Sequence, residues 1–189
     1  MLKLNTETGL LHPVRHLPSP NFNERPVEAE ISLLVVHGIS LPEGHFDTPY
    51  IDALFTNTLD VSQDPSFAPL KDLQVSAHLL IDRLGEVTQY VPFSKRAWHA
   101  GASQFESQSN CNDFSIGIEL VGADTVIYTA LQYKKLVEIT RVLMHYYPRI
   151  TRQRIVGHSD IAPGRKTDPG PAFDWGYFFE ELNNFNLKE

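Results

Sequence analysis

The sequence predicts an α/β protein, more closely α+β, with a central mixed β-sheet flanked by helices. Residues 32–37 are a short, continuously apolar run, which is typical of a strand buried on both faces, and residues 114–120 read as another strand. Residues 74–91 contain two strand patterns on either side of a turn, and residues 129–147 repeat apolar positions at helical spacing. Such a set of elements packs as a sheet covered by helices.

The first half of the chain is expected to hold an arm, a short helix and the hairpin. Residues 1–30 are rich in Pro, Asn and Glu, so we expect an irregular N-terminal arm lying on the domain. Thr48 is suited to cap a short helix over residues 49–55, with Pro49 in its first position. The hairpin turns at residues 82–85, where a glycine can adopt a positive φ.

The second half is expected to hold a long helix, a last strand and a closing helix. Thr129 and Gln132 form a capping box at the start of the long helix, and Pro148 ends it. The last strand covers residues 154–158 and runs into a stiff, polar loop that we expect to be irregular. The closing helix is expected over residues 175–182.

Composition indicates one globular domain, residues 1–189, in a reducing compartment. The 189 residues are 42% hydrophobic and 21% charged, with no internal repeat or linker. No apolar run approaches the roughly 18 residues of a membrane span, and the N-terminus lacks the pattern of a secretory signal. The lone cysteine, Cys111, excludes an internal disulfide framework. The cytoplasm is therefore the expected location.

The charge pattern favours a small-molecule substrate. A formal net charge of −7 without any block of Lys or Arg argues against nucleic acid or an anionic membrane as the main partner. An acidic ligand would have to be bound by a metal ion or by a few well-placed basic side chains. Nothing in the sequence indicates an obligate protein partner.

Two histidines at strand ends suggest a metal site. His37 closes the strand at residues 32–37, and His158 closes the strand at residues 154–158. Neutral imidazole is the commonest metal ligand in proteins, and two imidazoles from separate strands provide half of a zinc site. Three protein ligands with one open position are typical of catalytic zinc, whereas structural zinc is closed by four ligands, usually cysteines.

The third ligand should be anionic, and Asp160, Asp168 and Asp174 compete for this place. Asp168 is favoured because it lies far enough beyond His158 for the chain to turn back toward the histidine. The prolines that follow Asp168 would hold it rigidly.

Glu119 and Lys166 are candidate catalytic groups. Ser115, Gly117 and Glu119 share one face of their strand. A carboxylate on a central strand is costly unless something pairs with it, and the glycine beside it leaves room for a ligand or water. A glutamate near zinc-bound water would accept its proton, while the Lys166 ammonium could stabilise the oxyanion of a tetrahedral intermediate.

Each of these residues taken alone is more often structural. No compact motif such as HExxH is present, so the zinc interpretation depends on the joint occurrence of these residues. His78 is expected to face inward, with a contact to the site or to the substrate as the alternative. Trp98 and His99 could line a pocket with aromatic surface, and a core role for Trp98 is equally compatible with the pattern.

Five stretches resemble the amidase-2 and peptidoglycan-recognition-protein superfamily, and within it the cytoplasmic anhydromuramoyl-peptide amidases of cell-wall recycling in Gram-negative bacteria. These stretches are LLVVH with ISLP, VSAHLLI, YVPFSKRAWHAGAS, CNDFSIGIEL and GHSDIAPGRKTDPGPAFDW. The resemblance covers roughly residues 18–175, and the last motif is highly specific in length and content. It implies a mixed sheet flanked by helices.

The resemblance also implies roles for single residues. It implies zinc held by His37, His158 and Asp168, the trio that the spacing favours, and catalytic roles for Glu119 and Lys166. Relatives of the phage-lysozyme type carry a cysteine as third ligand. The implied reaction is hydrolysis of the amide between the lactyl group of 1,6-anhydro-N-acetylmuramic acid and L-alanine. We expect one substrate contact in particular, from Trp98.

Three positions depart from the family pattern. Gly38 stands where relatives tend to have Asn, and Gln74 and Asn110 stand where some relatives have Arg. Those arginines would suit the carboxylates of a stem peptide, so the departures put recognition of the peptide in doubt while leaving the metal chemistry intact. Another arginine could replace the missing ones in binding the stem peptide, and the sequence does not distinguish among Arg83, Arg96 and Arg165.

Three other functions compete with this interpretation. Some members of the superfamily bind peptidoglycan without cutting it, but they typically lack a ligand or catalytic group, and here every expected group is present. A zinc amidase acting on intact wall outside the cell is disfavoured by the lack of a signal pattern. A different zinc hydrolase, such as a deacetylase or peptidase, would be distinguished by its products.

Overall fold

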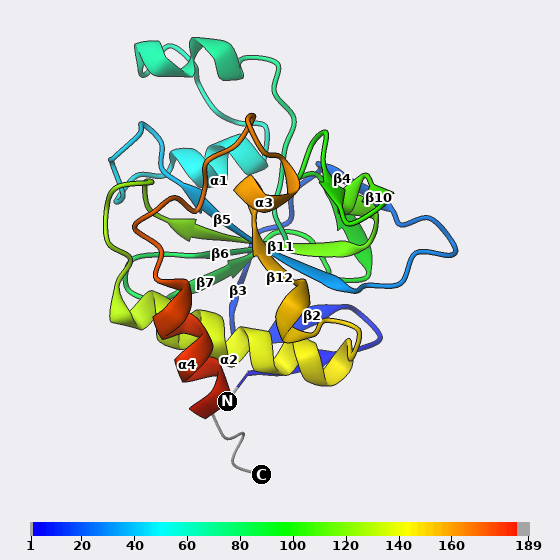
Figure 1. The fold of residues 1–189 in the computed structure, drawn as a ribbon. Helices are drawn as coiled ribbons and strands as arrows, with labels where there is room; N and C mark the ends of the chain where they lie inside the picture. The colour runs from blue at the N-terminus through cyan, green and yellow to red at the C-terminus, as the bar shows by residue number, and fades with distance from the viewer. Residues whose placement is uncertain (1, 185–189) are drawn as a thin grey trace.

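One six-stranded sheet forms the centre of the fold. The computed structural model describes residues 2–184, and Figure 1 shows the chain as a ribbon. The strand order is β12-β5-β11-β6-β7-β3. The strands are β3 (Arg15–His16), β5 (Leu33–Ile39), β6 (Leu79–Ile81), β7 (Val87–Gln89), β11 (Ser115–Val121) and β12 (Ile155–Gly157).

The sheet combines parallel and antiparallel pairs. β12, β5, β11 and β6 run parallel, β7 runs antiparallel to β6 in the predicted hairpin, and β3 is parallel to β7. Parallel strands are buried on both faces, which explains why β5 is continuously apolar up to His37. The carboxyl ends of β12, β5 and β11 meet at one edge of the sheet.

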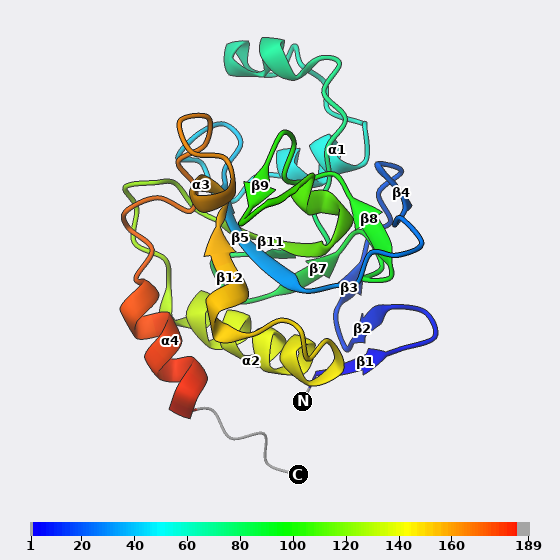
Figure 2. The ribbon, with the colours of Figure 1, turned by 45° about the vertical axis from the view of Figure 1, so that its right-hand side comes forward.

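Helices cover both faces of this sheet. Figures 1 and 2 show α2 and α4 along one face, with α1 and α3 on the other side. The helical segments are α1 (Tyr50–Phe55), α2 (Ala130–Tyr146), α3 (His158–Ile161) and α4 (Trp175–Asn184), with the 3-10 turns η1 (Pro65–Leu70), η2 (Cys111–Asp113) and η3 (Arg152–Arg154). The predicted fold class is therefore confirmed. Within residues 2–184, no helix has the length and apolar character needed to cross a bilayer.

The alternation of side chains along β5 and β11 separates an apolar face from a partly polar one. The side chains of these strands that join the large cluster beneath α2 and α4 are Leu34, Val36, Ile116, Ile118 and Leu120. Leu33 and Val35 point to the opposite face, toward Phe114 and Ile161. His37 follows Val35 by two residues, so it also lies on this second face.

The long helix begins as predicted. The Thr129 hydroxyl accepts a hydrogen bond from the Gln132 N–H at 3.1 Å, and the Gln132 side chain accepts one from the Thr129 N–H at 3.0 Å. This confirms the capping box. The Gln132 amide also donates to the carbonyls of Ile81 and Val121, which ties the start of α2 to β6 and β11.

The N-terminal arm is more ordered than the sequence predicts. Its residues form β1 (Lys3–Asn5), β2 (Leu10–His12), β3 and β4 (Phe22–Glu24). β1 pairs with β2, β3 extends the main sheet beside β7, and β4 pairs with β8 (Lys95–Ala97). The prediction of an irregular arm is wrong because strands of two or three residues carry no readable alternation and form through pairing with distant segments.

Two further local predictions are corrected. The Thr48 hydroxyl donates to the carbonyl of Leu41 and does not cap α1, whose N-cap position is Pro49. The polar loop was expected to be irregular from Gly157 onward, yet His158 opens the short helix α3. A small hairpin, β9 (Gln104–Phe105) with β10 (Gln108–Ser109), also lies in a stretch where the sequence predicts no strand.

Removal of the capping box tests how α2 is held. We expect Thr129→Ala to lower the free energy of unfolding by about 1 kcal/mol, because the Gln132 N–H loses its acceptor. The measurement is urea denaturation followed by circular dichroism. The matched control is Thr125→Ala, at an exposed position just before the helix. Equal stability of the two variants would contradict the role of the capping box.

Candidate active site

Three side chains far apart in the sequence converge at the carboxyl edge of the sheet. Nδ1 of His37 lies 3.0 Å from Nδ1 of His158. Oδ2 of Asp168 lies 3.2 Å from Nδ1 of His37 and 3.1 Å from Nδ1 of His158. The predicted trio therefore forms a compact triangle of two nitrogen atoms and one oxygen atom.

Strand register places the two histidines side by side. β12 is parallel to β5, and its last residue, Gly157, pairs with Val36. His158 comes one residue later, so it lies level with His37. On the other side of β5, His37 pairs with Glu119 of β11. Residues from three adjacent strands or strand ends thus stand in one row across the sheet.

The loop after α3 returns the third member of the triangle. The Ser159 N–H donates to the carbonyl of Asp168 at 3.0 Å, which closes the loop between them. The two other candidate aspartates act as helix caps. Asp160 accepts from the Gly157 N–H at 2.7 Å, and Asp174 accepts from the Tyr177 N–H at 2.9 Å. Asp168 is thus the aspartate that the fold brings to both histidines.

The donor set fits a zinc ion. Tetrahedral zinc with ligand distances of about 2.0–2.1 Å separates its ligand atoms by roughly 3.3 Å, close to the three distances of the triangle. His37 and His158 face each other with like nitrogens, and two neutral imidazoles in that position need a proton or a cation between their lone pairs. Both rings are buried, whereas 15% of the Asp168 side chain is exposed, so the triangle borders solvent on the side of the carboxylate.

Contacts behind the rings determine which nitrogen is free. Nε2 of His158 lies 3.3 Å from the carbonyl of Ala100 and donates its proton there, which leaves Nδ1 as a lone pair facing the triangle. Nε2 of His37 lies 3.0 Å from Nδ1 of His99. Backing of a ligand ring by a second acceptor is usual at metal sites.

Electrostatics of the trio match a cation-binding role. Burial lowers the pKa of His37 to about 4, so the ring is neutral at physiological pH. Burial acts to raise the pKa of Asp168, but its hydrogen bonds with His158 and His37 outweigh this and hold the pKa far below the usual range. The site therefore presents a neutral imidazole at His37 and a carboxylate at Asp168.

Glu119 stands beside the triangle as a buried carboxyl group. Its Oε1 lies 4.0 Å from Nδ1 of His37, and its Oε2 is buried without a hydrogen-bond partner. Burial raises the pKa of Glu119 well above its usual value, the charge of Asp168 adds to this, and the ammonium of Lys166 opposes it. An unpaired carboxyl group next to a potential metal site is suited to exchange protons.

Lys166 differs from the other candidates because its side chain is exposed. Its positive charge nevertheless acts on both His37 and Glu119, lowering the pKa of each. The loop therefore carries an exposed ammonium group within electrostatic range of the trio.

Gly117 does not leave open space, contrary to the prediction. A Cβ at this position would lie 2.5 Å from Nδ1 and 2.6 Å from Cδ2 of His99, so the imidazole fills the room that the missing side chain leaves. His78 faces inward as predicted. Its Nδ1 accepts from the Gly117 N–H at 3.0 Å, and its Nε2 donates to the carbonyl of Lys95 at 3.1 Å.

Trp98 directly follows β8 and is half-buried. Its indole Nε1 donates to Oδ1 of Asn23 in β4 at 2.7 Å, so the N-terminal arm fixes the orientation of the ring. A contact with substrate stays a prediction.

The positions that depart from the family pattern are structurally occupied. A Cβ at Gly38 would overlap the hydroxyl of Tyr128, which donates to the carbonyl of Pro169 at 2.9 Å. Asn110 adopts the left-handed conformation before η2, with a φ of 60°. Gln74 is exposed and borders a separate hollow beside α1.

The three arginines proposed as compensation have other contacts. Arg96 pairs with Asp113, Arg165 donates to the carbonyls of Ala100 and Ala102, and Arg83 stacks on Phe46. These contacts favour none of the three as the group that replaces the missing arginines.

Sequence reasoning missed the roles of two aromatic side chains. His99 packs on Gly117, and Tyr128 packs on Gly38 and Gly122, where a Cβ would lie 2.9 Å from its Cζ. Glycines within or directly after buried strands are the sequence signal for this, because they mark close approach of another group. The identity of that group depends on tertiary packing.

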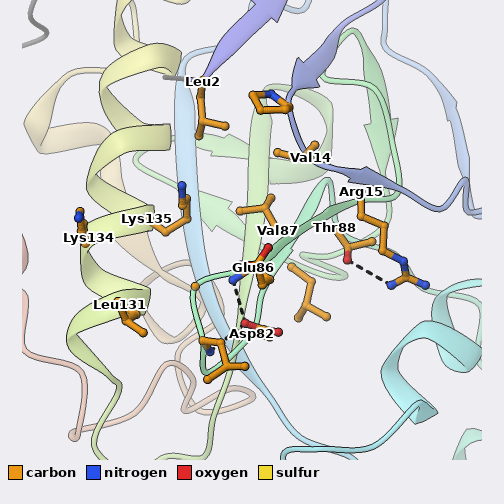
Figure 3. Close-up of a pocket in the computed structure, with 14 residues that line it drawn as sticks. Leu2, Val14, Arg15, Asp82, Glu86, Val87, Thr88, Leu131, Lys134 and Lys135 are labelled. Atoms are coloured by element: carbon orange, nitrogen blue, oxygen red, sulfur yellow. Dashed lines mark hydrogen bonds between the residues drawn. The ribbon is translucent and has the colours of Figure 1, made fainter.

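A separate cavity of about 550 Å³ lies between the N-terminal segment, the β6–β7 hairpin and α2 (Figure 3). Leu2, Val14 and Val87 point into it, and Lys134 and Lys135 border it from α2. None of the candidate site residues lines this cavity, so it is distinct from the triangle.

Comparison with known proteins gives a consistent match. Residues 27–171 match the Amidase_2 family, described as N-acetylmuramoyl-L-alanine amidase. The chain is 56% identical over 183 residues to the 1,6-anhydro-N-acetylmuramyl-L-alanine amidase AmpD of Enterobacter cloacae, covering 97% of each chain.

Solved structures agree with this match. A crystal structure of a selenomethionine derivative of AmpD superimposes with a TM-score of 0.90 at 54% identity, covering 94% of this chain and 97% of the other. The amidase AmiD of E. coli, solved with anhydro-N-acetylmuramic acid-L-Ala-D-γ-Glu-L-Lys, gives a TM-score of 0.60 at 28% identity. That match covers 85% of this chain and 65% of the other.

The packing of Tyr128 on Gly38 can be tested by a double-mutant cycle. We expect Gly38→Ala to lower the free energy of unfolding by more than about 1 kcal/mol, because the new methyl group overlaps the Tyr128 hydroxyl. In a Tyr128→Phe background the cost should fall, since the next ring atom, Cζ, lies 3.6 Å away. Urea denaturation of the four proteins measures this. Equal costs in both backgrounds would contradict the packing.

Burial of His78 should make stability depend on pH. Burial, reinforced by the charge of Arg25, lowers the pKa of His78 to about 3, whereas an unfolded chain takes up this proton near pH 6.5. Between about pH 3 and 6.5 the unfolded state binds more protons. The free energy of unfolding should therefore fall as pH drops through this window, by roughly 1 kcal/mol per pH unit from this residue.

The measurement is the free energy of unfolding from pH 4 to 7. His78→Asn should be less stable at pH 7 and should show a weaker fall toward pH 4, because one buried imidazole no longer has to remain neutral. The control is His145→Asn, at an exposed position, which should keep the original slope. An unchanged slope in His78→Asn would show that the ring is protonated in the folded state.

Proposed function

The chain belongs to the N-acetylmuramoyl-L-alanine amidase family, and from this premise we propose that it is a zinc-dependent amidase acting on anhydromuropeptides. The bond cleaved is the amide between the lactyl group of 1,6-anhydro-N-acetylmuramic acid and L-alanine. The observation that carries the proposal is the triangle of His37, His158 and Asp168 beside the buried, unpaired carboxyl group of Glu119.

The relatives support the choice of substrate. AmpD of Enterobacter cloacae is named for the 1,6-anhydro form of the substrate, and it matches nearly the whole chain at 56% identity. AmiD, the more distant amidase, was solved with an anhydromuramic acid bearing a tripeptide. Because the match to AmpD covers nearly the whole of both chains, we extend this substrate class to the present chain.

His37, His158 and Asp168 would hold the zinc ion. A bound Zn²⁺ supplies a Lewis acid for the scissile carbonyl and makes a coordinated water more acidic. The protein contributes rigidity, because two ligands sit on the ends of paired strands and the third is returned by the loop closed at Ser159.

Glu119 acts as the general base and then as the general acid. Its buried carboxylate accepts one proton from the attacking water, whose oxygen bonds to the carbonyl carbon of the lactyl group. The same proton is delivered to the alanine nitrogen when the C–N bond breaks. The charge of Lys166, together with that of a bound cation, favours the ionised form of Glu119 that the first step requires.

Lys166 stabilises the oxyanion of the tetrahedral intermediate. Its ammonium group is exposed and therefore free to move toward a substrate carbonyl, and its charge already reaches Glu119 and His37. The products are the anhydro-sugar with a free lactyl carboxylate and a stem peptide with a free amino group.

We place this reaction in the recycling of cell-wall fragments in the cytoplasm. The relatives are named for a 1,6-anhydro-N-acetylmuramyl substrate, which we take to be a fragment of the cell wall, and the buried thiol of Cys111 is compatible with a reducing compartment. Small, soluble fragments also suit a site that needs no basic surface.

One experiment tests the function directly. Purified protein is analysed for bound metal and incubated with an anhydromuropeptide, and the products are identified by mass spectrometry with and without a chelator. We expect one Zn²⁺ per chain and release of free stem peptide that stops on chelation. Binding without cleavage would indicate a recognition module, and loss of an acetyl group or of a terminal amino acid would indicate another hydrolase.

Replacement of the proposed base separates chemistry from metal binding. We expect Glu119→Gln to reduce kcat by about 10²–10⁴-fold, because proton transfer is lost, while the zinc content stays at one per chain. Steady-state kinetics and metal analysis measure the two quantities. Glu180→Gln, at an exposed position on α4, is the control and should retain full activity. Near-normal turnover of Glu119→Gln would refute this role.

A further inference from the structure

A line of buried hydrogen bonds runs from His37 away from the triangle. Nε2 of His37 lies 3.0 Å from Nδ1 of His99, and Nε2 of His99 lies 3.2 Å from the hydroxyl oxygen of Ser115. All three residues are buried, and the two rings meet edge to face with centroids 5.0 Å apart. The line is therefore shielded from bulk solvent.

The polarity of this line follows from the ligand position of His37. If Nδ1 of His37 offers its lone pair to a cation, the ring proton is on Nε2, and it is donated to Nδ1 of His99. His99 then carries its own proton on Nε2 and donates it to Ser115. A reversed line would place a proton on Nδ1 of His37 and block the metal position.

The side-chain amide of Asn112 holds the backbone at His99 and Ala100. Oδ1 of Asn112 accepts from the His99 N–H at 3.1 Å and from the Ala100 N–H at 2.8 Å. The carbonyl of Ala100 in turn accepts the Nε2 proton of His158. His99 thus contacts His37, the next residue Ala100 contacts His158, and Asn112 holds the backbone of both.

Gly117 makes the position of the His99 ring possible. It lies on the same face of β11 as Ser115 and Glu119, and any side chain there would overlap the imidazole. The ring is therefore seated on the strand between the hydroxyl that accepts its proton and the carboxyl group of the proposed base. A side chain that only filled this space would not need one nitrogen facing His37 and another facing Ser115.

We propose that His99 is a positioning residue that holds His37 in the Nε2-protonated tautomer and aims its Nδ1 at the metal, with Ser115 as the terminal acceptor and Gly117 as the seat of the ring. This inference rests on the proposed zinc site, and it adds a residue that touches neither substrate nor metal. Outer partners of metal-bound histidines typically change metal affinity by about 10–100-fold when removed.

The test measures zinc affinity by competition with a chromophoric chelator. His99→Leu keeps apolar bulk but removes both nitrogens, and we expect a Kd for Zn²⁺ about 10–100-fold higher. His99→Gln can accept from His37 through its oxygen and donate to Ser115 through its amide, so it should recover most of the affinity. Gly117→Ala should weaken binding with His99 intact, because the methyl group displaces the ring.

Two further readouts distinguish positioning from general destabilisation. Long-range ¹⁵N–¹H spectra should show the His37 proton on Nε2 in the original protein and a mixture of tautomers in His99→Leu. The visible absorption of the Co²⁺-substituted protein should change in His99→Leu and return in His99→Gln. The control for lost stability away from the site is Thr129→Ala, at the start of α2, which should bind Zn²⁺ as the original protein does.

The outcomes separate this inference from the proposed function. If the original protein binds no stoichiometric Zn²⁺, the proposed function fails. If the original protein binds Zn²⁺ and folded His99→Leu binds it equally well with an unchanged Co²⁺ spectrum, the positioning role is overturned. Equal weakening in His99→Gln and His99→Leu would also overturn it, because the effect would then not follow hydrogen-bonding capacity.

Discussion

The site depends on the register of three neighbouring segments at one edge of the sheet. The parallel pairing of β12, β5 and β11 sets His158, His37 and Glu119 in one row, so that two imidazoles and a carboxyl group face the same side. Parallel pairing is rigid here because both faces of β5 and β11 are packed. A slip of one residue in either pair would turn one member of the row into the apolar core beneath α2.

The second organising feature is the use of glycine within these strands and directly after β11. Gly117 admits the His99 ring, while Gly38 and Gly122 admit Tyr128. Each aromatic group then makes a hydrogen bond toward the site, His99 to the His37 ring and Tyr128 to the carbonyl of Pro169, next to Asp168. The fold thereby supports two of the three candidate ligands from behind, and glycine provides the space in which the supporting groups lie.

Polar groups buried at this face lower the stability of the molecule, and they gather around the candidate site. Glu119 has a buried oxygen atom without a partner, and the neutral rings of His37, His78 and His99 are held in surroundings that disfavour their charged forms. These costs are tolerated because the opposite face of the sheet holds one large apolar cluster that spans β5, β11, α2 and α4. The apolar core and the candidate site therefore lie on opposite faces of one sheet.

The sequence alone determined the class of fold and the capping box of α2, because both depend on local periodicity and on neighbouring residues. It also proposed His37, His158, Asp168, Glu119 and Lys166 as the candidate site, from residue types at strand ends and from the family resemblance. Only the tertiary structure decided that Asp160 and Asp174 are helix caps, that short strands order the N-terminal arm, and that His99 fills the space at Gly117. These features arise from contacts between segments tens of residues apart. Strand pairing and close packing select them, and neither is encoded in the spacing of any single stretch.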